Sequence, residues 1–130
     1  MIKHVTKQEL VSAFTKAMDQ VYDQEPDVET AMLRQSLIME EAKEVTQELL
    51  RPVINKVALT KELADLLYVV HGTAVAFGLP LDVAFNRVHD SNMSKLGPDG
   101  KPLYRDDDKV LKGPNYQPPK LDDLFDEPTE

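Results

Sequence analysis

Apolar side chains recur every three or four residues through most of the first 96 positions, the spacing that places them on one face of an α-helix. Breaks that contain proline or glycine divide this pattern into four segments. The sequence therefore predicts four helices, over residues 7–22, 28–50, 57–77 and 80–95. Their ends carry start and stop signals: Thr6 with Glu9 forms a capping box, Asp27 can cap the second helix, and Gly78 follows the third.

The second and third predicted helices are apolar on most of their circumference, which is typical of buried helices. Only residues 52–57 separate them, and so short a link predicts that the two helices pack antiparallel. Glu41 and Glu44 lie near the end of the first of these helices, and Glu62 and Asp65 near the start of the second. An antiparallel pair would bring these four carboxylates to the same height.

Carboxylates on apolar helices need neutralisation, because burying an unpaired charge is costly. The nearby cations, Lys43 and Lys61, are expected to point away from the acidic positions. Carboxylate oxygens without histidine or cysteine suit Mg²⁺ or Mn²⁺ better than zinc. The residues alone leave two interpretations open, a divalent-metal site between two helices and a solvated acidic face.

Composition limits the remaining choices. A chain of 130 residues predicts one domain, 1–130, with a helical core over residues 6–96 and an irregular segment over residues 97–130. The net charge of −8 argues against a nucleic-acid partner, and no apolar run is long enough to span a bilayer. Cysteine and an N-terminal apolar signal region are both lacking, so we expect a cytoplasmic protein.

The acidic residues stand in a recognisable pattern. The stretch LIMEEAKE at residues 37–44 and ELADLL at residues 62–67 resemble the ExxE…ExxD signature of the all-α nucleoside triphosphate pyrophosphohydrolases, or MazG-like enzymes. The segments SNMSKL at 91–96, DGKP at 99–102 and KVLKGPNY at 109–116 are similar to a bacterial and phage branch that includes the dGTP-hydrolysing MazZ enzymes. The family pattern predicts a glycine turn just before Lys109. This chain departs from it, because it has Asp106, Asp107 and Asp108 there.

The resemblance implies a four-helix MazG-like bundle that hydrolyses a nucleoside triphosphate to monophosphate and pyrophosphate. Because the second and third helices are too apolar for a lone chain to cover, we expect a homodimer or a dimer of dimers. The resemblance also implies Mg²⁺ as the cofactor, with Mn²⁺ able to substitute. By motif, the expected metal ligands are Glu41, Glu44, Glu62 and Asp65, and Glu40 is the expected catalytic residue that orients or deprotonates water. The expected substrate-binding residues are Asn92, Lys95, Lys112 and Tyr116, and the candidates for contact with the base are Phe14, Met18 and Asp19.

Three alternatives remain open at this stage. Within the same superfamily the chain could be a phosphoribosyl-ATP pyrophosphohydrolase or a dUTPase-like enzyme instead of a (d)GTP or other purine nucleotide hydrolase. Outside it, the acids could be an exposed stripe on a non-catalytic helical interaction module. Spacing cannot identify the base, because base choice depends on pocket shape and on a few hydrogen-bonding groups.

Overall fold

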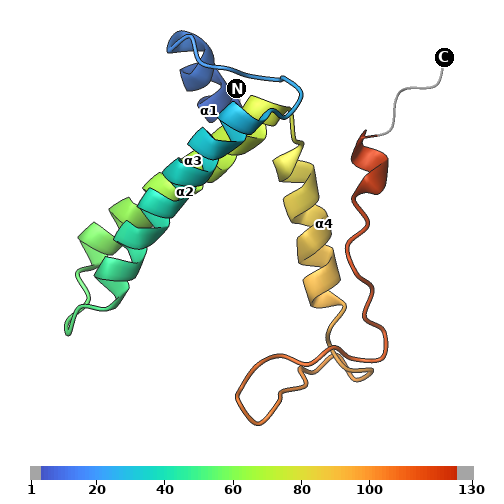
Figure 1. Cartoon of the computed structure of the whole chain (residues 1–130). Coiled ribbons are helices and arrows are strands. Elements are labelled where there is room, and N and C mark those ends of the chain that lie inside the picture. The colour runs from blue at the N-terminus through green and yellow to red at the C-terminus, as the bar shows by residue number, and fades with distance from the viewer. Residues whose placement is uncertain (1–3, 126–130) are drawn as a thin grey trace, which may run out of the picture. The chain divides into compact units, whose positions relative to one another are not determined.

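The computed structural model describes residues 4–125, and its helices are α1 (Lys7–Ala17), α2 (Val28–Leu49), α3 (Lys56–Phe77) and α4 (Leu81–Met93), with a final 3₁₀ turn, η1 (Asp122–Phe125) (Figure 1). The only β pairing among these residues is one isolated bridge between Tyr104 and Val110. The predicted all-α class is therefore confirmed. The chain forms two compact units, one ending at Leu81 and one beginning at Asp82, and each is described by itself.

Side-chain caps start the first three helices; the sequence predicts those at Thr6 and Asp27, and Asn55 adds a third. The Thr6 hydroxyl accepts the backbone N–H of Glu9 at 3.1 Å, and the Asp27 carboxylate accepts that of Thr30 at 2.8 Å. The Asn55 amide oxygen accepts the N–H of Ala58 at 3.0 Å. Each contact satisfies a donor that the first helical turn leaves without an intrahelical partner. Gly78, with φ of 64°, ends α3 in the left-handed conformation that glycine adopts without strain.

The first helix ends five residues earlier than predicted, at Ala17 instead of residue 22. Asp19 adopts a φ of 53°, which takes the backbone out of the helix. The chain that follows is bound to the end of α3, since the N–H groups of Asp23 and Gln24 donate to the carbonyls of Val75 and Ala76 at 2.8 and 3.0 Å. These contacts are distant in sequence, so helical periodicity could not predict them.

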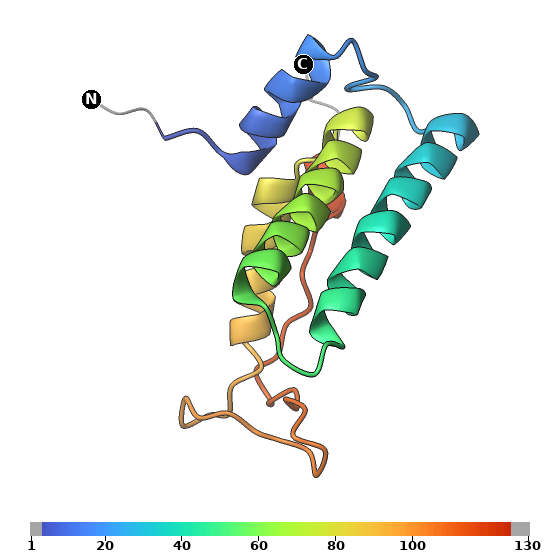
Figure 2. The ribbon, with the colours of Figure 1, turned by 90° about the vertical axis from the view of Figure 1, so that its left-hand side faces the viewer.

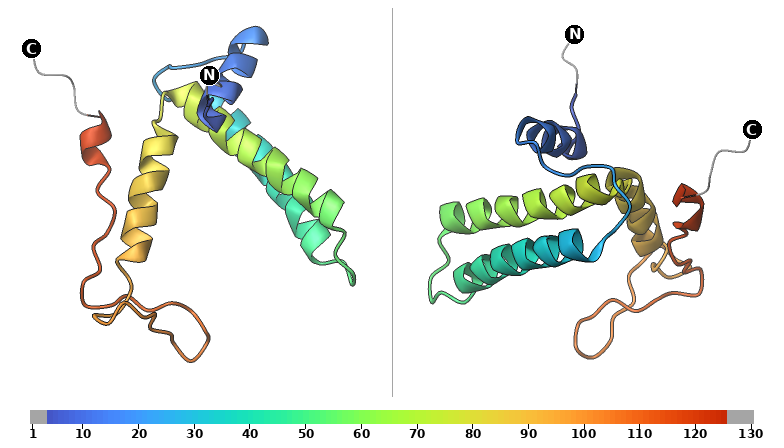
Figure 3. Two further views of the ribbon diagram at one scale, coloured as in Figure 1. Left: turned by 180° about the vertical axis from the view of Figure 1, so that it is seen from behind. Right: turned by 45° about the horizontal axis from the view of Figure 1, so that its top comes forward.

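Helices α2 and α3 run side by side and antiparallel, joined by the short loop after Leu50, while α1 packs on α3 (Figures 2 and 3). The most buried apolar side chains lie on α1, α2 and the C-terminal half of α3: Val11, Val45, Ala74, Val75 and Ala76. The predicted hairpin is therefore confirmed. It sets the relative height of the residues near its closed end.

Within the single chain, the packing of α3 does not provide the burial expected for α2 on most of its circumference. Val28, Met32 and Met39 are 77%, 67% and 59% exposed. A helix that packs on one antiparallel neighbour covers one of its faces, so apolar residues on its other faces stay exposed to solvent. Apolar side chains with similar exposure also lie on the loop after α2, including Leu50 and Val53.

The second unit consists of α4 and the chain after it, whose final stretch runs back alongside α4 (Figure 1). Arg87 donates to the Lys120 carbonyl at 3.0 Å and forms an ion pair with Asp123 at 2.6 Å. Between these segments lies a loop in which Asp108 has a φ of 63°. An aspartate thus supplies the left-handed turn for which the family resemblance suggests glycine, and aspartate is among the residues that tolerate it best.

Within the described residues, no single helix is both long enough and apolar enough to span a membrane, although α3 and α4 taken together meet the criteria of length and composition.

Candidate metal centre

Four carboxylates gather between α2 and α3. Glu41 and Glu44 come from α2, Glu62 and Asp65 come from α3, and one oxygen from each lies within 4.8 Å of the others. A spacing of three residues places each pair on one helix face. The short antiparallel hairpin then sets the two pairs at the same height, as the sequence predicts.

This cluster is only partly neutralised. One oxygen of Glu41 and one of Glu62 are buried and have no hydrogen-bond partner among the described residues. A hydrogen bond with Glu44 raises the pKa of Glu62, and burial and the Glu44 charge act in the same direction. Buried oxygens without partners and a carboxyl with a raised pKa are what crowded carboxylates show without a cation between them. The donor set, made only of carboxylate oxygens, fits a hard divalent ion.

One expectation about the surrounding cations is wrong. Lys61 does not point away, because its ammonium nitrogen lies 2.8 Å from an oxygen of Asp65 and 3.5 Å from one of Glu62. Both carboxylates raise the pKa of Lys61, Asp65 more strongly. A lysine stem is long and flexible enough to reach across a helical turn. The Lys61 side chain is 65% exposed, so this contact lies at the solvent-facing rim of the cluster. Ion pairs in such positions contribute little to stability.

Glu40 is exposed on α2 and does not belong to the set of four carboxylates. The predicted substrate-binding residues lie in the second unit. There Asn92 is exposed, the Lys95 carbonyl accepts the N–H of Gly113 at 2.9 Å, and the Lys112 ammonium lies 4.7 Å from the centre of the Tyr116 ring. The structure therefore brings together the four expected metal ligands, and the roles of the other five residues stay predictions.

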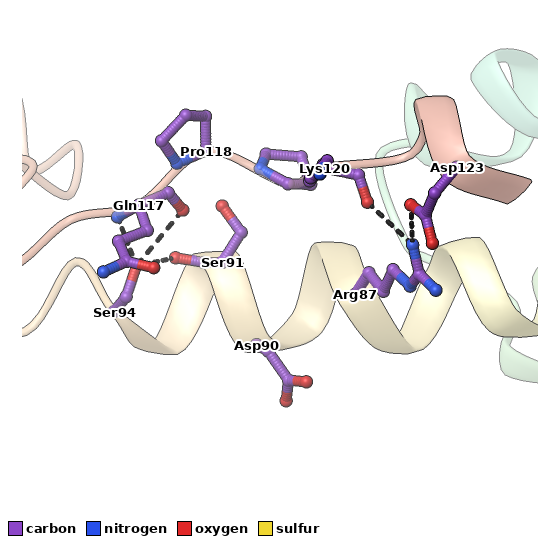
Figure 4. A pocket seen from close by; sticks show the side chains of 9 residues that line it. Arg87, Asp90, Ser91, Ser94, Gln117, Pro118, Lys120 and Asp123 are labelled. Atoms are coloured by element: carbon purple, nitrogen blue, oxygen red, sulfur yellow. Dashed lines mark hydrogen bonds and ion pairs between the residues drawn. The ribbon is translucent and has the colours of Figure 1, made fainter.

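Sequence reasoning missed two cavities. In the second unit, a cavity of about 460 Å³ lies between α4 and the C-terminal segment, lined by Arg87, Ser91 and Ser94 on one side and residues 117–120 on the other (Figure 4). Arg87 and Ser94 are already hydrogen bonded to that segment, while Asp90 points away from it. In the first unit, a cavity of about 400 Å³ lies beside α2 and is lined by Arg34 and Asp19, among others. No motif marks either place.

Comparison with known families assigns the chain. The model of a family described as phosphoribosyl-ATP pyrophosphohydrolase matches residues 8–92, a range that includes all four clustered carboxylates. The chain belongs to this pyrophosphohydrolase family. The resemblance to the all-α nucleoside triphosphate pyrophosphohydrolases is thereby confirmed at the level of the superfamily.

Comparison with solved structures gives a second match. The match is a crystal structure described as that of a "putative NTP pyrophosphohydrolase" from Exiguobacterium sp. 255-15. Its chain has 28% sequence identity with the chain described here. The match covers 88% of this chain and 75% of that chain, with a TM-score of 0.46. A comparison with curated proteins gives no match.

Proposed function

We propose that this member of the phosphoribosyl-ATP pyrophosphohydrolase family hydrolyses the anhydride bond between the α- and β-phosphates of a nucleotide, with Mg²⁺ as cofactor and Mn²⁺ able to substitute. The products are a nucleoside monophosphate and pyrophosphate. The observation that carries the proposal is the set of four carboxylates within 4.8 Å of one another, two of which have buried oxygens without hydrogen-bond partners in the described chain.

In this proposal Glu41, Glu44, Glu62 and Asp65 hold the cation. A bound divalent ion neutralises phosphate charge and lowers the pKa of water. Glu40, the exposed neighbour of Glu41, orients the attacking water and accepts its proton. The water oxygen bonds to the α-phosphorus as the bond from that phosphorus to the α–β bridging oxygen breaks. The bridging oxygen leaves with pyrophosphate. Phosphoryl transfer depends mainly on such positioning and charge neutralisation.

The substrate-binding roles fall to Asn92, Lys95, Lys112 and Tyr116. Lysine ammonium groups suit the negative charge of phosphates, and the Lys112 ammonium already lies against the Tyr116 ring. For the substrate itself we propose a (d)NTP with a purine base, possible roles being removal of an unwanted triphosphate or supply of dGMP. The description of the matching family favours a second candidate, phosphoribosyl-ATP.

We also propose a homodimer or a dimer of dimers in the cytoplasm. The support is the exposure of large apolar side chains on α2, such as Val28 at 77% and Met32 at 67%. Groups of exposed large apolar side chains are typical of protein interfaces.

The test is a product assay with a panel of dNTPs, NTPs and phosphoribosyl-ATP, in Mg²⁺ and in EDTA. Formation of pyrophosphate and monophosphate only with metal, lost in Glu41→Gln, supports the proposal. Release of orthophosphate instead would place the cleavage at another bond. Absence of stoichiometric Mg²⁺ or Mn²⁺ binding by calorimetry, together with no turnover of any substrate, would favour a non-catalytic interaction module.

A further inference from the structure

In the second unit, the chain from Gln117 to Lys120, called the strap below, crosses α4 and is attached to it at both ends (Figure 4). At one end the Gln117 N–H donates to the Ser94 hydroxyl at 3.0 Å. At the other end Arg87 donates to the Lys120 carbonyl at 3.0 Å and forms its ion pair with Asp123 at 2.6 Å. The Arg87–Asp123 contact, called the clasp below, thus holds the end of the strap that is farther from Gln117.

The length of the strap matches the distance between its two attachment points. Seven residues separate Arg87 from Ser94, which corresponds to about 10 Å along a helix axis. The Ser94 N–H still donates to the Asp90 carbonyl at 3.1 Å, so helical geometry continues to this point. Three residue steps of extended chain also span about 9–10 Å. The strap is therefore extended between its attachments and has little slack.

Two prolines make the strap stiff. Pro118 and Pro119 each have a fixed φ, and a proline also restricts the residue before it to extended conformations. Neither proline has an N–H group, so the middle of the strap needs no acceptor from α4. The cavity of about 460 Å³ lies beneath it. A stiff strap without slack transmits a displacement at one end to the other.

The predicted substrate-binding pair, Lys112 and Tyr116, directly precedes the strap. On one side the pair is anchored at Gly113, where a Cβ would lie only 2.5 Å from the carbonyl oxygen of Leu96. The Tyr116 N–H donates to the Gly113 carbonyl at 3.2 Å, and the Lys112 ammonium lies 4.7 Å from the centre of the Tyr116 ring. On the other side the pair is held through Gln117, where the strap begins.

We propose that Arg87 and Asp123 are positioning residues that act through the strap to hold Lys112 and Tyr116 in place for substrate. This inference rests on the proposed function, in which that pair contacts the nucleotide. The side chains of the clasp are 35% and 45% exposed, and ion pairs of this exposure shift an equilibrium only about two- to fivefold. Opening the clasp widens the range of positions of Tyr116 and weakens substrate binding, while the acidic cluster is left unchanged.

Amide hydrogen exchange, followed by NMR without substrate, measures opening at both ends of the strap. Asp123→Asn keeps the side-chain shape and removes the charge, and should speed exchange about two- to fivefold at Leu124, beside the clasp, and also at Gln117. Arg87→Met should do the same, whereas Arg87→Lys, which keeps the ion pair, should stay closer to wild type. Asp122→Asn is the matched control, because Asp122 has no hydrogen bond with Arg87 in the described chain. Faster exchange at Leu124 alone would show that the strap transmits nothing, and would overturn this inference.

The product assay with the same nucleotide panel supplies the second measurement. For the nucleotide that is hydrolysed, Asp123→Asn and Arg87→Met should raise KM about two- to fivefold and leave kcat unchanged, while Asp122→Asn changes neither. Reversing both charges, with Arg87→Asp and Asp123→Arg together, should bring KM back toward the wild-type value from that of Arg87→Asp alone.

The two measurements separate this inference from the proposed function. Faster exchange at Gln117 in Asp123→Asn, with no hydrolysis of any nucleotide by the wild type, would overturn the proposed function alone. Hydrolysis with an unchanged KM in Asp123→Asn, or with the same rise in KM in Asp122→Asn, would overturn this inference alone. A fall in kcat at constant KM would also overturn it, because the clasp would then act on the chemical step instead of on binding.

Discussion

The substitution Glu41→Gln should stabilise the metal-free protein and remove its response to Mg²⁺. In the metal-free state Glu41 contributes one of four carboxylates whose nearest oxygens lie within 4.8 Å of one another, and one of its oxygens is buried without a partner among the described residues. Glutamine keeps the shape of the side chain and removes its charge. The substitution therefore isolates the electrostatic cost of the cluster from its packing.

The size of the effect follows from the separation of the charges. Two unit charges 4.8 Å apart repel by about 0.9 kcal/mol in water and about 3.5 kcal/mol at an effective dielectric constant of 20. The cluster is partly exposed and the pKa of Glu62 is raised, so we take the lower end for each neighbour and expect a gain of about 1–2 kcal/mol. For a chain of this length, that gain corresponds to a rise in Tm of about 4–8 °C.

Thermal unfolding in EDTA and in excess Mg²⁺ measures both sides of the prediction. At a free Mg²⁺ concentration one hundred times Kd, the wild type should gain about 2.7 kcal/mol, or roughly 10 °C, whereas Glu41→Gln should gain little. Glu40→Gln is the matched control, since it changes the same net charge on the same helix at an exposed position outside the cluster. A lower Tm for Glu41→Gln in EDTA, or equal behaviour of the two variants, would refute the reasoning.

Three further predictions concern the fold and its acids. Because Glu44 raises the pKa of Glu62, the stability that protonated Glu62 contributes is complete below the ordinary pKa of 4.5 and is lost as pH rises through the raised pKa. Urea unfolding in EDTA across this pH range should show a weaker decline for Glu62→Gln, and parallel curves would contradict a raised pKa of Glu62 in the folded protein. Asn55→Ala removes the cap of α3 and should cost about 1 kcal/mol, or roughly 4 °C in Tm; an unchanged Tm would mean that water replaces the cap. Light scattering should give the mass of a dimer or tetramer, and a monomeric mass across micromolar concentrations would rule out the proposed oligomer.

The parts of the fold that the sequence predicts are those fixed by neighbouring residues. Thr6 and Asp27 cap their helices through contacts three residues away, and Gly78 ends α3 by its own backbone preference. The end of α1 was missed because it depends on Asp19 and on hydrogen bonds to the end of α3. Met18 and Val21 continue the apolar period past that end, so local pattern and distant contacts disagree there.

The candidate metal centre also combines features that local sequence predicts with features that it does not. The convergence of the four carboxylates was predictable because it needs only a spacing of three residues and a short link between two helices. The contact of Lys61 with Asp65 was not, because it depends on the rotamers of a long exposed side chain. The Arg34 cavity was also out of reach, since it depends on an approach to Gly72 across 38 positions of the chain.

Apolar periodicity identifies which face of a helix avoids water, but not what covers that face. On α2 the pattern marks two sides as apolar, and the packing of α3 accounts for one of them. Met32 and Met39 stay 67% and 59% exposed, as expected if the second side is completed by another surface. The helix that supplies Glu41 and Glu44 is thus held by its neighbour α3 on one side only. An oligomer that covered the other side would stiffen the same helix, so dissociation should weaken metal binding as well as lower stability.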